Sequence, residues 1–293
     1  MSTIGQAQQD ALFSQYMFNP FAINPAYAGS RDAISAVLIN RNQWLGLEGA
    51  PTTQTLSMHV PTNKNKLAWG INLTHDKVGP VRNILFQGTA AYHLVLQKGI
   101  LSFGLRGGIF NTQIDHGLLT FREENDQVDT KERYSALVPS FDFGLYYYTP
   151  KYFAGLSVNH LTRHQYNLPG LVNHDQYYLK RHYYLSTGYV FDVDYNILLK
   201  PSVLIKYTKQ MPLNIDFNLQ ALFYKKFWLG IGVRNYNTIV FLTDINIKDY
   251  LRIGYSYDLA LTKLNNYTYG SHEILIGFDF NIKKRNITSP RYL

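Results

Sequence analysis

The sequence predicts an all-β protein, a transmembrane antiparallel β-barrel of about 14 strands preceded by an N-terminal extended segment rich in aromatic residues and Asn-Pro steps. Three observations lead to this prediction. Charged residues make up only 16% of the 293 residues, against roughly 25% in soluble domains, and the chain has 24 tyrosines. Apolar and polar residues alternate with period two along most of it. No apolar run reaches about 18 residues, so crossing a membrane would require a closed barrel.

The N-terminal segment, residues 8–30, reads FSQYMFNPFAINPAYAGS from Phe13 onwards. An αR backbone at Asn19 or Asn24 would clash with the ring of the proline that follows, so we predict extended or turn backbone in place of one continuous helix. Residues 1–7 end in the small-x-small pattern GQA, which we interpret as the remnant of a signal peptide. The aromatic residues of the segment are expected either to plug or cap the barrel or to dock a partner protein.

The barrel is predicted over residues 31–293. The last strand shows the pattern well, because Ile274, Ile276, Phe278 and Phe280 share one face, and the other face carries Glu273, Gly277, Asp279 and Asn281. Strands of about ten residues suit a tilted crossing of a bilayer. The predicted strands cover residues 33–44, 52–60, 67–76, 83–96, 100–114, 138–148, 151–159, 180–192, 196–207, 213–224, 227–235, 238–246, 250–258 and 271–282.

The predicted connections alternate between short turns and longer loops. The longest loops cover residues 115–137, 160–179 and 259–270, and the connections at the other end of the barrel have only a few residues each. Outer-membrane barrels have short periplasmic turns and longer outer loops. We therefore predict the outer membrane of a Gram-negative bacterium as the location, outer-membrane lipid as the surroundings, and both termini in the periplasm.

Ten charged residues fall on the polar faces of these strands, where they would point into the lumen. They are Arg41, Arg106, Arg234, Arg252, Asp142, Asp216, Asp244, Asp258, Glu273 and Asp279. Because buried charges must be paired, the preferred interpretation is a set of ion pairs that fills the lumen. A selective pore lined by the same residues is the alternative.

No motif of an enzyme is present, and we predict neither catalytic residues nor a cofactor. His160 and His164 have a spacing that suits a metal on a helix, but they fall in a predicted loop without a third ligand, so we interpret them as solvent-exposed histidines and predict no metal site. The chain has no cysteine, which excludes disulfides and thiolate chemistry. Its net charge of +8 is scattered, and nucleic acid is not expected as a partner.

The N-terminal segment resembles the signature of the PorP/SprF family of the type IX secretion and gliding machinery. The residues that carry the resemblance are Ser14, Gln15, Tyr16, Met17, Asn19, Asn24, Pro25, Ala26, Tyr27, Ala28 and Gly29. The resemblance implies a non-enzymatic outer-membrane barrel that associates with periplasmic ring components of the secretion or gliding apparatus. It further implies a role in the export and cell-surface anchoring of a secreted protein with a C-terminal sorting domain.

Two other functions stay open at this point: an outer-membrane porin or small-molecule transporter, and a soluble all-β binding protein, which the low charge and high tyrosine content disfavour. If the chain anchors an exported protein, the long outer loops would supply the contact, because tyrosine is enriched among interface hot spots. The candidate contacts are Tyr166, Tyr177, Tyr178, Tyr267 and Tyr269. A place in the aromatic girdle of the membrane is the alternative role for those nearest the strands.

Overall fold

The structure is a computed structural model that describes residues 13–31, 33–62, 66–118, 133–162, 165–166 and 177–281. The helices in these ranges are single 3-10 turns, η1 (Pro20–Ala22), η2 (Pro25–Tyr27), η3 (His116–Leu118) and η4 (Lys263–Asn266). Among the described residues, no helix combines the length and apolar character that crossing a membrane requires. The strands are β1 (Ala33–Asn42), β2 (Thr52–Pro61), β3 (Leu67–Val78), β4 (Val81–Val95), β5 (Ile100–Asp115), β6 (Arg133–Tyr148), β7 (Tyr152–Asn159), β8 (Gln165–Tyr166), β9 (Tyr177–Tyr178), β10 (His182–Tyr189), β11 (Phe191–Asp194), β12 (Ile197–Thr208), β13 (Asn214–Phe223), β14 (Phe227–Arg234), β15 (Thr238–Lys248), β16 (Leu251–Ala260) and β17 (Ser271–Asn281).

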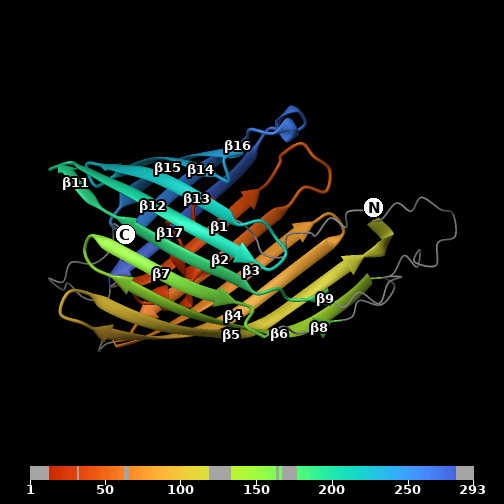
Figure 1. Cartoon of the computed structure of the whole chain (residues 1–293), viewed down its shortest axis with the longest axis horizontal. Helices are drawn as coiled ribbons and strands as arrows, with labels where there is room; N and C mark the ends of the chain where they lie inside the picture. Colours follow the sequence, from red (N-terminus) through yellow and green to blue (C-terminus); the bar gives the residue numbers. More distant parts are fainter. Residues whose placement is uncertain are drawn as a thin grey trace.

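Fourteen of the described strands close into an antiparallel barrel, which confirms the predicted fold (Figure 1). Consecutive strands of the barrel pair with each other, and β1 pairs with β17, which joins the first strand to the last. β10 pairs with both β7 and β12, so the ring passes from β7 to β10 without β8 and β9. The strand predicted at residues 180–192 is divided into β10 and β11, and β11 continues the pairing with β12. The two-residue strands β8 and β9 form a separate ribbon.

The two faces of the barrel wall differ as the alternation predicts. On β17, Ile274 and Phe278 are exposed on the outside, whereas Glu273 and Leu275 are completely buried toward the lumen. The same outward exposure of large apolar side chains recurs on every long strand of the described barrel, for example at Leu56, Trp69, Phe86, Leu105, Phe141, Leu219 and Phe241. An apolar outer band is what the hydrocarbon core of a bilayer requires of a barrel.

The two ends of the barrel carry connections of different length. One end, which we call the short-turn end, joins β2 to β3, β4 to β5, β6 to β7, β13 to β14 and β15 to β16 by a few residues each. The other, the loop end, carries η4 and the β8–β9 ribbon and lies at the right in Figure 1. Strand β6 begins at Arg133, so the loop predicted at residues 115–137 is shorter by several residues. Strand β1 begins, and β17 ends, at the short-turn end.

Candidate functional site

Residues 13–31, named here the lumen segment, lie inside the barrel. Ser14 contacts side chains of β1, β16 and β17, Tyr16 contacts β13, Phe21 contacts β2, and Asn24 contacts β6. These partners are spread around the ring, and the side chains among them belong to the inward faces of their strands, so only a position within the lumen satisfies them all. The segment is buried along its length, with Gln15, Phe21, Ala26 and Ala28 wholly inaccessible to solvent.

Two 3-10 turns organise the lumen segment, so it is not extended throughout. Each turn begins at a proline, whose missing N–H is not needed at a helix start. Asn24 precedes the second turn with φ −134° and ψ 110°, the extended backbone expected before a proline. Its Oδ1 accepts a hydrogen bond of 2.9 Å from the N–H of Ala26, and its Nδ2 donates to the carbonyl oxygen of Leu145 at 2.9 Å. Asn24 therefore caps the turn and fastens it to β6.

Ser14 is the centre of a buried ion-pair network in the loop-end half of the lumen. Its hydroxyl donates to Asp258 Oδ2 at 2.7 Å and accepts from Arg41 Nη1 at 2.9 Å and from Arg234 Nη2 at 3.1 Å. Arg41 also pairs with Asp258 at 2.7 Å, and Arg234 pairs with it at 3.2 Å. One hydroxyl thus joins charged side chains from β1, β14 and β16.

The backbone of the lumen segment holds a second carboxylate beside this network. The N–H groups of Ser14 and Gln15 donate to the two oxygens of Glu273, each at 2.8 Å. Gln15 Nε2 donates to the carbonyl oxygen of the same glutamate at 3.1 Å. Arg41 Nη1 lies 3.1 Å from Glu273 Oε2, so the carboxylate is neutralised as well as hydrogen bonded. This pairing explains why a Ser-Gln step opens the segment.

The middle of the segment packs on aromatic and cationic side chains. Tyr16 accepts a hydrogen bond of 2.6 Å from Asn218 Nδ2, and Phe18 meets Trp228 edge to face with ring centroids 5.9 Å apart. Lys200 is buried with its Nζ 4.9 Å from the centre of the Trp228 ring and 5.7 Å from that of Phe18. Such cation–π contacts stabilise a desolvated ammonium by about 2 kcal/mol.

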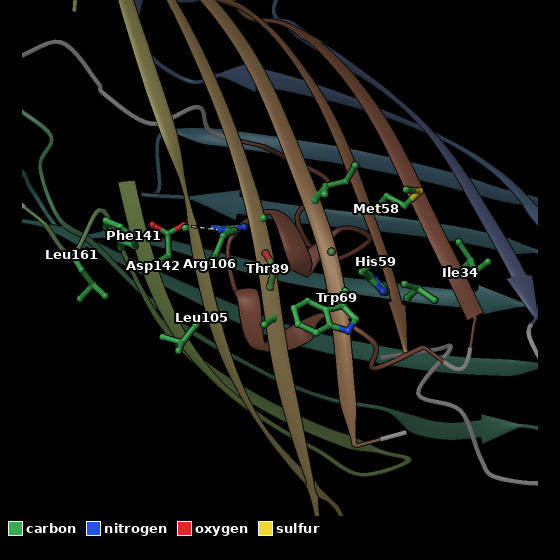
Figure 2. Close-up of a pocket in the computed structure, with 16 residues that line it drawn as sticks. Ile34, Met58, His59, Trp69, Thr89, Leu105, Arg106, Phe141, Asp142 and Leu161 are labelled. Atoms are coloured by element: carbon green, nitrogen blue, oxygen red, sulfur yellow. Dashed lines mark hydrogen bonds and ion pairs between the residues drawn. The ribbon is translucent and has the colours of Figure 1, made fainter. Parts of the chain in front are cut away.

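Arg106 fastens the first turn to the opposite wall. Its Nε pairs with Asp142 Oδ2 at 2.7 Å, drawn as a dashed line in Figure 2, and its Nη1 donates to the carbonyl oxygen of Phe21 at 3.0 Å. Gln87 Nε2 and the N–H of His160 donate to the same carboxylate, each at 2.8 Å. An arginine that joins a carboxylate to backbone carbonyls leaves few of its donors unsatisfied, which a buried guanidinium needs.

The prediction that His160 is exposed to solvent is wrong. His160 is buried, and its Nδ1 lies 2.8 Å from Ser140 Oγ. Its backbone adopts φ +55° directly after β7, and Asn159 and His160 are both buried. His164, the other member of the predicted pair, lies outside the described residues. Within the described residues no group of three His, Asp, Glu or Cys side chains is arranged to hold a metal ion.

At the short-turn end the segment leaves the lumen through a cluster of rings and one ion pair. Tyr27 packs edge to face on His59 and Tyr146, with centroids 5.7 and 5.3 Å apart. Arg31 donates from Nε to the hydroxyl of Tyr27 at 3.2 Å and pairs with Asp279 at 2.7 Å. The last residue of the segment is thereby joined to the last strand of the barrel, immediately before β1 begins.

Glycines on the inner wall make room for the segment. A Cβ atom on Gly104 would lie 2.2 Å from the backbone nitrogen of Ala26, and one on Gly144 would lie 2.1 Å from Asn24 Oδ1. A Cβ on Gly70 would lie 2.6 Å from Phe21, and one on Gly254 would lie 2.4 Å from Gln15 Oε1. These glycines of the inner face therefore leave the space that the segment occupies.

The direction of the segment bears on the predicted position of the amino terminus. Ser14 lies beside Arg41 and Arg234, which are at the loop end of their strands, and Arg31 lies beside Asp279 at the short-turn end. The described segment therefore runs down the lumen from the loop end to the short-turn end. Residues 1–12 and 282–293 lie outside the described residues, so the location of both termini stays a prediction.

The structure brings together nearly all the site residues that the sequence predicts. The eleven motif residues lie in the lumen segment, and each of the ten predicted lumen charges belongs to an ion pair. Sequence reasoning missed Arg31, Lys200 and Lys206, the last of which pairs with Asp216 at 2.8 Å. Lys200 and Lys206 alternate with apolar residues on a predicted strand, a signal that would have placed them in the lumen.

The five candidate partner contacts all fall at the loop end. Tyr166 and Tyr177 are register partners in the β8–β9 ribbon, next to the pair formed by Gln165 and Tyr178. Tyr267 and Tyr269 follow η4 and are 72% and 76% exposed. Their shared location is consistent with one binding surface, and their role in binding stays a prediction.

Comparison with known proteins adds a family and a fold. The model of the family described as "Type IX secretion system membrane protein PorP/SprF" matches residues 5–278. No curated protein matches the sequence. Among solved structures, the Ralstonia pickettii toluene transporter TbuX is similar at 11% identity and a TM-score of 0.53, over 88% of this chain and 92% of that one. The CymD monoaromatic hydrocarbon channel is similar at 15% identity and a TM-score of 0.51, over 92% of both chains. At such identities the likeness shows the barrel fold alone.

Proposed function

The chain belongs to the PorP/SprF family of type IX secretion system membrane proteins, and from this membership we propose a non-enzymatic outer-membrane barrel that partners the export and cell-surface anchoring of a secreted protein. The secreted protein would carry a C-terminal sorting domain, and ring components of the secretion or gliding apparatus would bind from the periplasm. Family and fold are those of a secretion or transport membrane protein.

The observation that supports this proposal most is the filled lumen. A diffusion porin needs a continuous aqueous path, but the lumen segment occupies the centre of this barrel with neutralised charges and packed aromatic rings. Breaking a buried ion pair by removing one partner costs about 3–5 kcal/mol, so the network resists displacement by water or solute. A barrel closed in this way serves as a scaffold whose two ends bind other proteins.

The difference between the two ends supports the orientation. With the loop end outside the cell and the short turns in the periplasm, the barrel follows the usual arrangement of outer-membrane proteins. A specific protein contact needs about 800 Å² from each partner, and the loop end carries the longest connections between strands. We place the exported protein on the loop end, with Tyr267 and Tyr269 as exposed anchors, and the secretion machinery at the short-turn end.

The experiment that tests the anchoring role replaces residues 165–178, which contain the β8–β9 ribbon, with a short Gly-Ser linker. The barrel wall is complete without this ribbon, so insertion in the outer membrane should be unchanged. The exported partner should then appear in the medium instead of on the cell surface. A matched replacement of residues 224–226, a tight turn at the opposite end, should leave surface retention unaltered.

The alternative function, a porin or small-molecule transporter, predicts a different outcome. Cells that lack the whole barrel would then retain every exported protein on their surface and would lose uptake of a small solute. That result would exclude the anchoring role.

A further inference from the structure

The outer surface of the barrel carries an apolar groove that the described residues leave open. Its volume is about 860 Å³, and it crosses the strands from β1 to β6 and ends at the residue that follows His160 (Figure 2). Its walls include the outward side chains of Trp69, Leu105 and Phe141, which are 55%, 63% and 47% exposed. The groove therefore faces the hydrocarbon of the membrane.

The groove exists because two neighbouring outward positions lack side chains. Gly88 on β4 and Gly107 on β5 are register partners, flanked in the same row by Ile71 on β3 and Phe141 on β6. A Cβ atom on Gly88 would meet nothing within 4 Å. Neighbouring outward positions on β4 and β5 include the large apolar residues Phe86, Leu105 and Ile109, so the glycine pair forms a depression between them.

Arg181 places a positive charge beyond the Phe141 end of the same row. Beyond Phe141, the backbone N–H of Leu161 donates to the carbonyl oxygen of Phe141 at 2.7 Å, and Leu161 lines the groove. Arg181 Nε in turn donates to the carbonyl oxygen of Leu161 at 2.7 Å, and the guanidinium is solvent exposed. Among the described residues, no carboxylate forms an ion pair with Arg181.

The geometry of the row matches the depth of one leaflet. Four strand spacings of about 4.8 Å separate Arg181, just before β10, from Gly88 on β4, or about 19 Å along the sheet. Because the strands tilt by roughly 40°, this distance corresponds to about 12 Å of depth. Half of a hydrocarbon core of roughly 30 Å is about 15 Å. A chain that starts at the headgroup level beside Arg181 would thus reach the middle of the bilayer near the glycine pair.

We propose that this groove binds an acyl chain of an anionic, phosphate-bearing lipid in the leaflet at the loop end, with the lipid phosphate on Arg181. The groove supplies the apolar contact, and the exposed guanidinium supplies the complementary charge and the fork geometry that suits phosphate. The site does not depend on the anchoring role proposed above, because its apolar walls lie on the lipid face and include none of the five candidate contact tyrosines.

The test uses Trp69 as a reporter in reconstituted bilayers of phosphatidylcholine. In a Trp44→Phe background the only other tryptophan is Trp228, which is buried in the lumen away from lipid. Phosphatidylglycerol with brominated acyl chains is titrated in and quenches the fluorescence of Trp69, and brominated phosphatidylcholine is titrated in parallel. The relative association constant should favour phosphatidylglycerol about fivefold, the preference that one arginine gives near a membrane surface.

Two variants and two matched controls decide the outcome. Arg181→Gln should reduce the preference to about one, and Gly88→Leu, which fills the groove from an open position, should weaken quenching by both brominated lipids. Lys77→Gln, an outward basic residue at the loop end of β3, and Ala154→Leu, added bulk on the outer face of β7, should change neither. Equal quenching by the two lipids in the wild-type barrel would overturn the proposal. Shielding of Trp69 from both lipids that increases with the protein-to-lipid ratio would assign the groove to a second copy and would also overturn it.

Discussion

At the scale of single residues, a serine hydroxyl determines how the charges of the lumen are arranged. Ser14 Oγ contacts Arg41, Arg234 and Asp258 at 2.7 to 3.1 Å, and these partners are 27 to 244 residues away in the chain. Because a hydroxyl both donates and accepts hydrogen bonds, it can donate to one carboxylate and accept from two guanidinium groups at once. No other side chain of similar size has this combination, apart from threonine.

Ser14→Ala should therefore destabilise the folded barrel by about 2–3 kcal/mol, since hydrogen bonds to buried charged groups are lost without replacement. The measurement is urea-induced unfolding of the protein in detergent micelles. Ser135→Ala is the control, because Ser135 is exposed on the outer face of β6 and its change should leave the free energy of unfolding within about 0.5 kcal/mol. Equal stability of the two variants would contradict the central role of Ser14.

The second prediction at this scale concerns Gly104, which lies against the lumen segment. A valine there would place Cβ within 2.2 to 2.6 Å of backbone atoms of Ala26 and Pro25, which cannot move aside as a flexible side chain could. Gly104→Val should therefore displace the lumen segment, and chymotrypsin should then cut after Tyr16 or Phe21. Gly88→Val adds the same bulk on the outer face and should remain resistant. Cleavage of the wild-type segment at the same rate as in Gly104→Val would refute the buried position.

At the scale of elements, the alternation of apolar and polar residues was sufficient to predict the strands of the barrel. Each predicted strand has a counterpart in the structure, because a shift of one residue would expose polar side chains such as Glu273 to lipid. The pattern could not predict the division of residues 180–192 into β10 and β11, which depends on pairing with β12. Nor could it place His160, whose burial follows from a positive φ and from tertiary contacts with Asp142 and Ser140.

The sequence pattern also could not specify how the charged residues of the lumen pair with each other. Their presence on the polar faces predicts ion pairing in a lumen, but the partners of Arg41 are 217 and 232 residues distant, and no local pattern encodes such contacts. The Asn-Pro steps predict extended or turn backbone instead of one continuous helix at residues 19–25, but they do not specify the 3-10 geometry of the two turns. The course of the segment along the lumen depends on glycines in four other strands, which only the assembled barrel brings together.

The outward face of β17 gives a prediction at the scale of the element. Ile276 pairs with Leu38 on β1 and Ile253 on β16, and all three point outward. Ile276→Arg should cost about 2–4 kcal/mol of stability in a bilayer, the range for arginine on the lipid face near the midplane. Ile276→Leu should cost less than about 1.5 kcal/mol. The folded fraction in lipid vesicles against urea concentration measures both.

Gly277, the residue after Ile276, tests whether the lumen is open or packed. An arginine at Gly277 would be tolerated in an open lumen, but a Cβ atom there would already lie 3.2 Å from the guanidinium of Arg252. Because the lumen is packed and already carries a positive charge at this point, Gly277→Arg should impair folding as well. Normal assembly of that variant would indicate more space in the lumen than the structure contains.

At the scale of the whole molecule, the barrel combines an apolar outer band, a neutralised and packed lumen, and two ends of unequal size. A wall of fourteen strands would enclose space for a ligand or a channel if it were empty. The lumen segment occupies that space, and this separates the protein from a simple pore of the same architecture. The wall faces the membrane, and we propose that the two ends bind protein partners.

The most direct test of this account is the ion conductance of the purified protein in planar bilayers. The wild-type barrel should show no steady conductance, because the lumen segment and its ion pairs close the path. Removal of residues 1–30 should produce a stable conductance, and Gly104→Val, which keeps the full chain, should produce frequent openings. A wild-type barrel that conducts as steadily as the variant without residues 1–30 would contradict the account and would favour a porin.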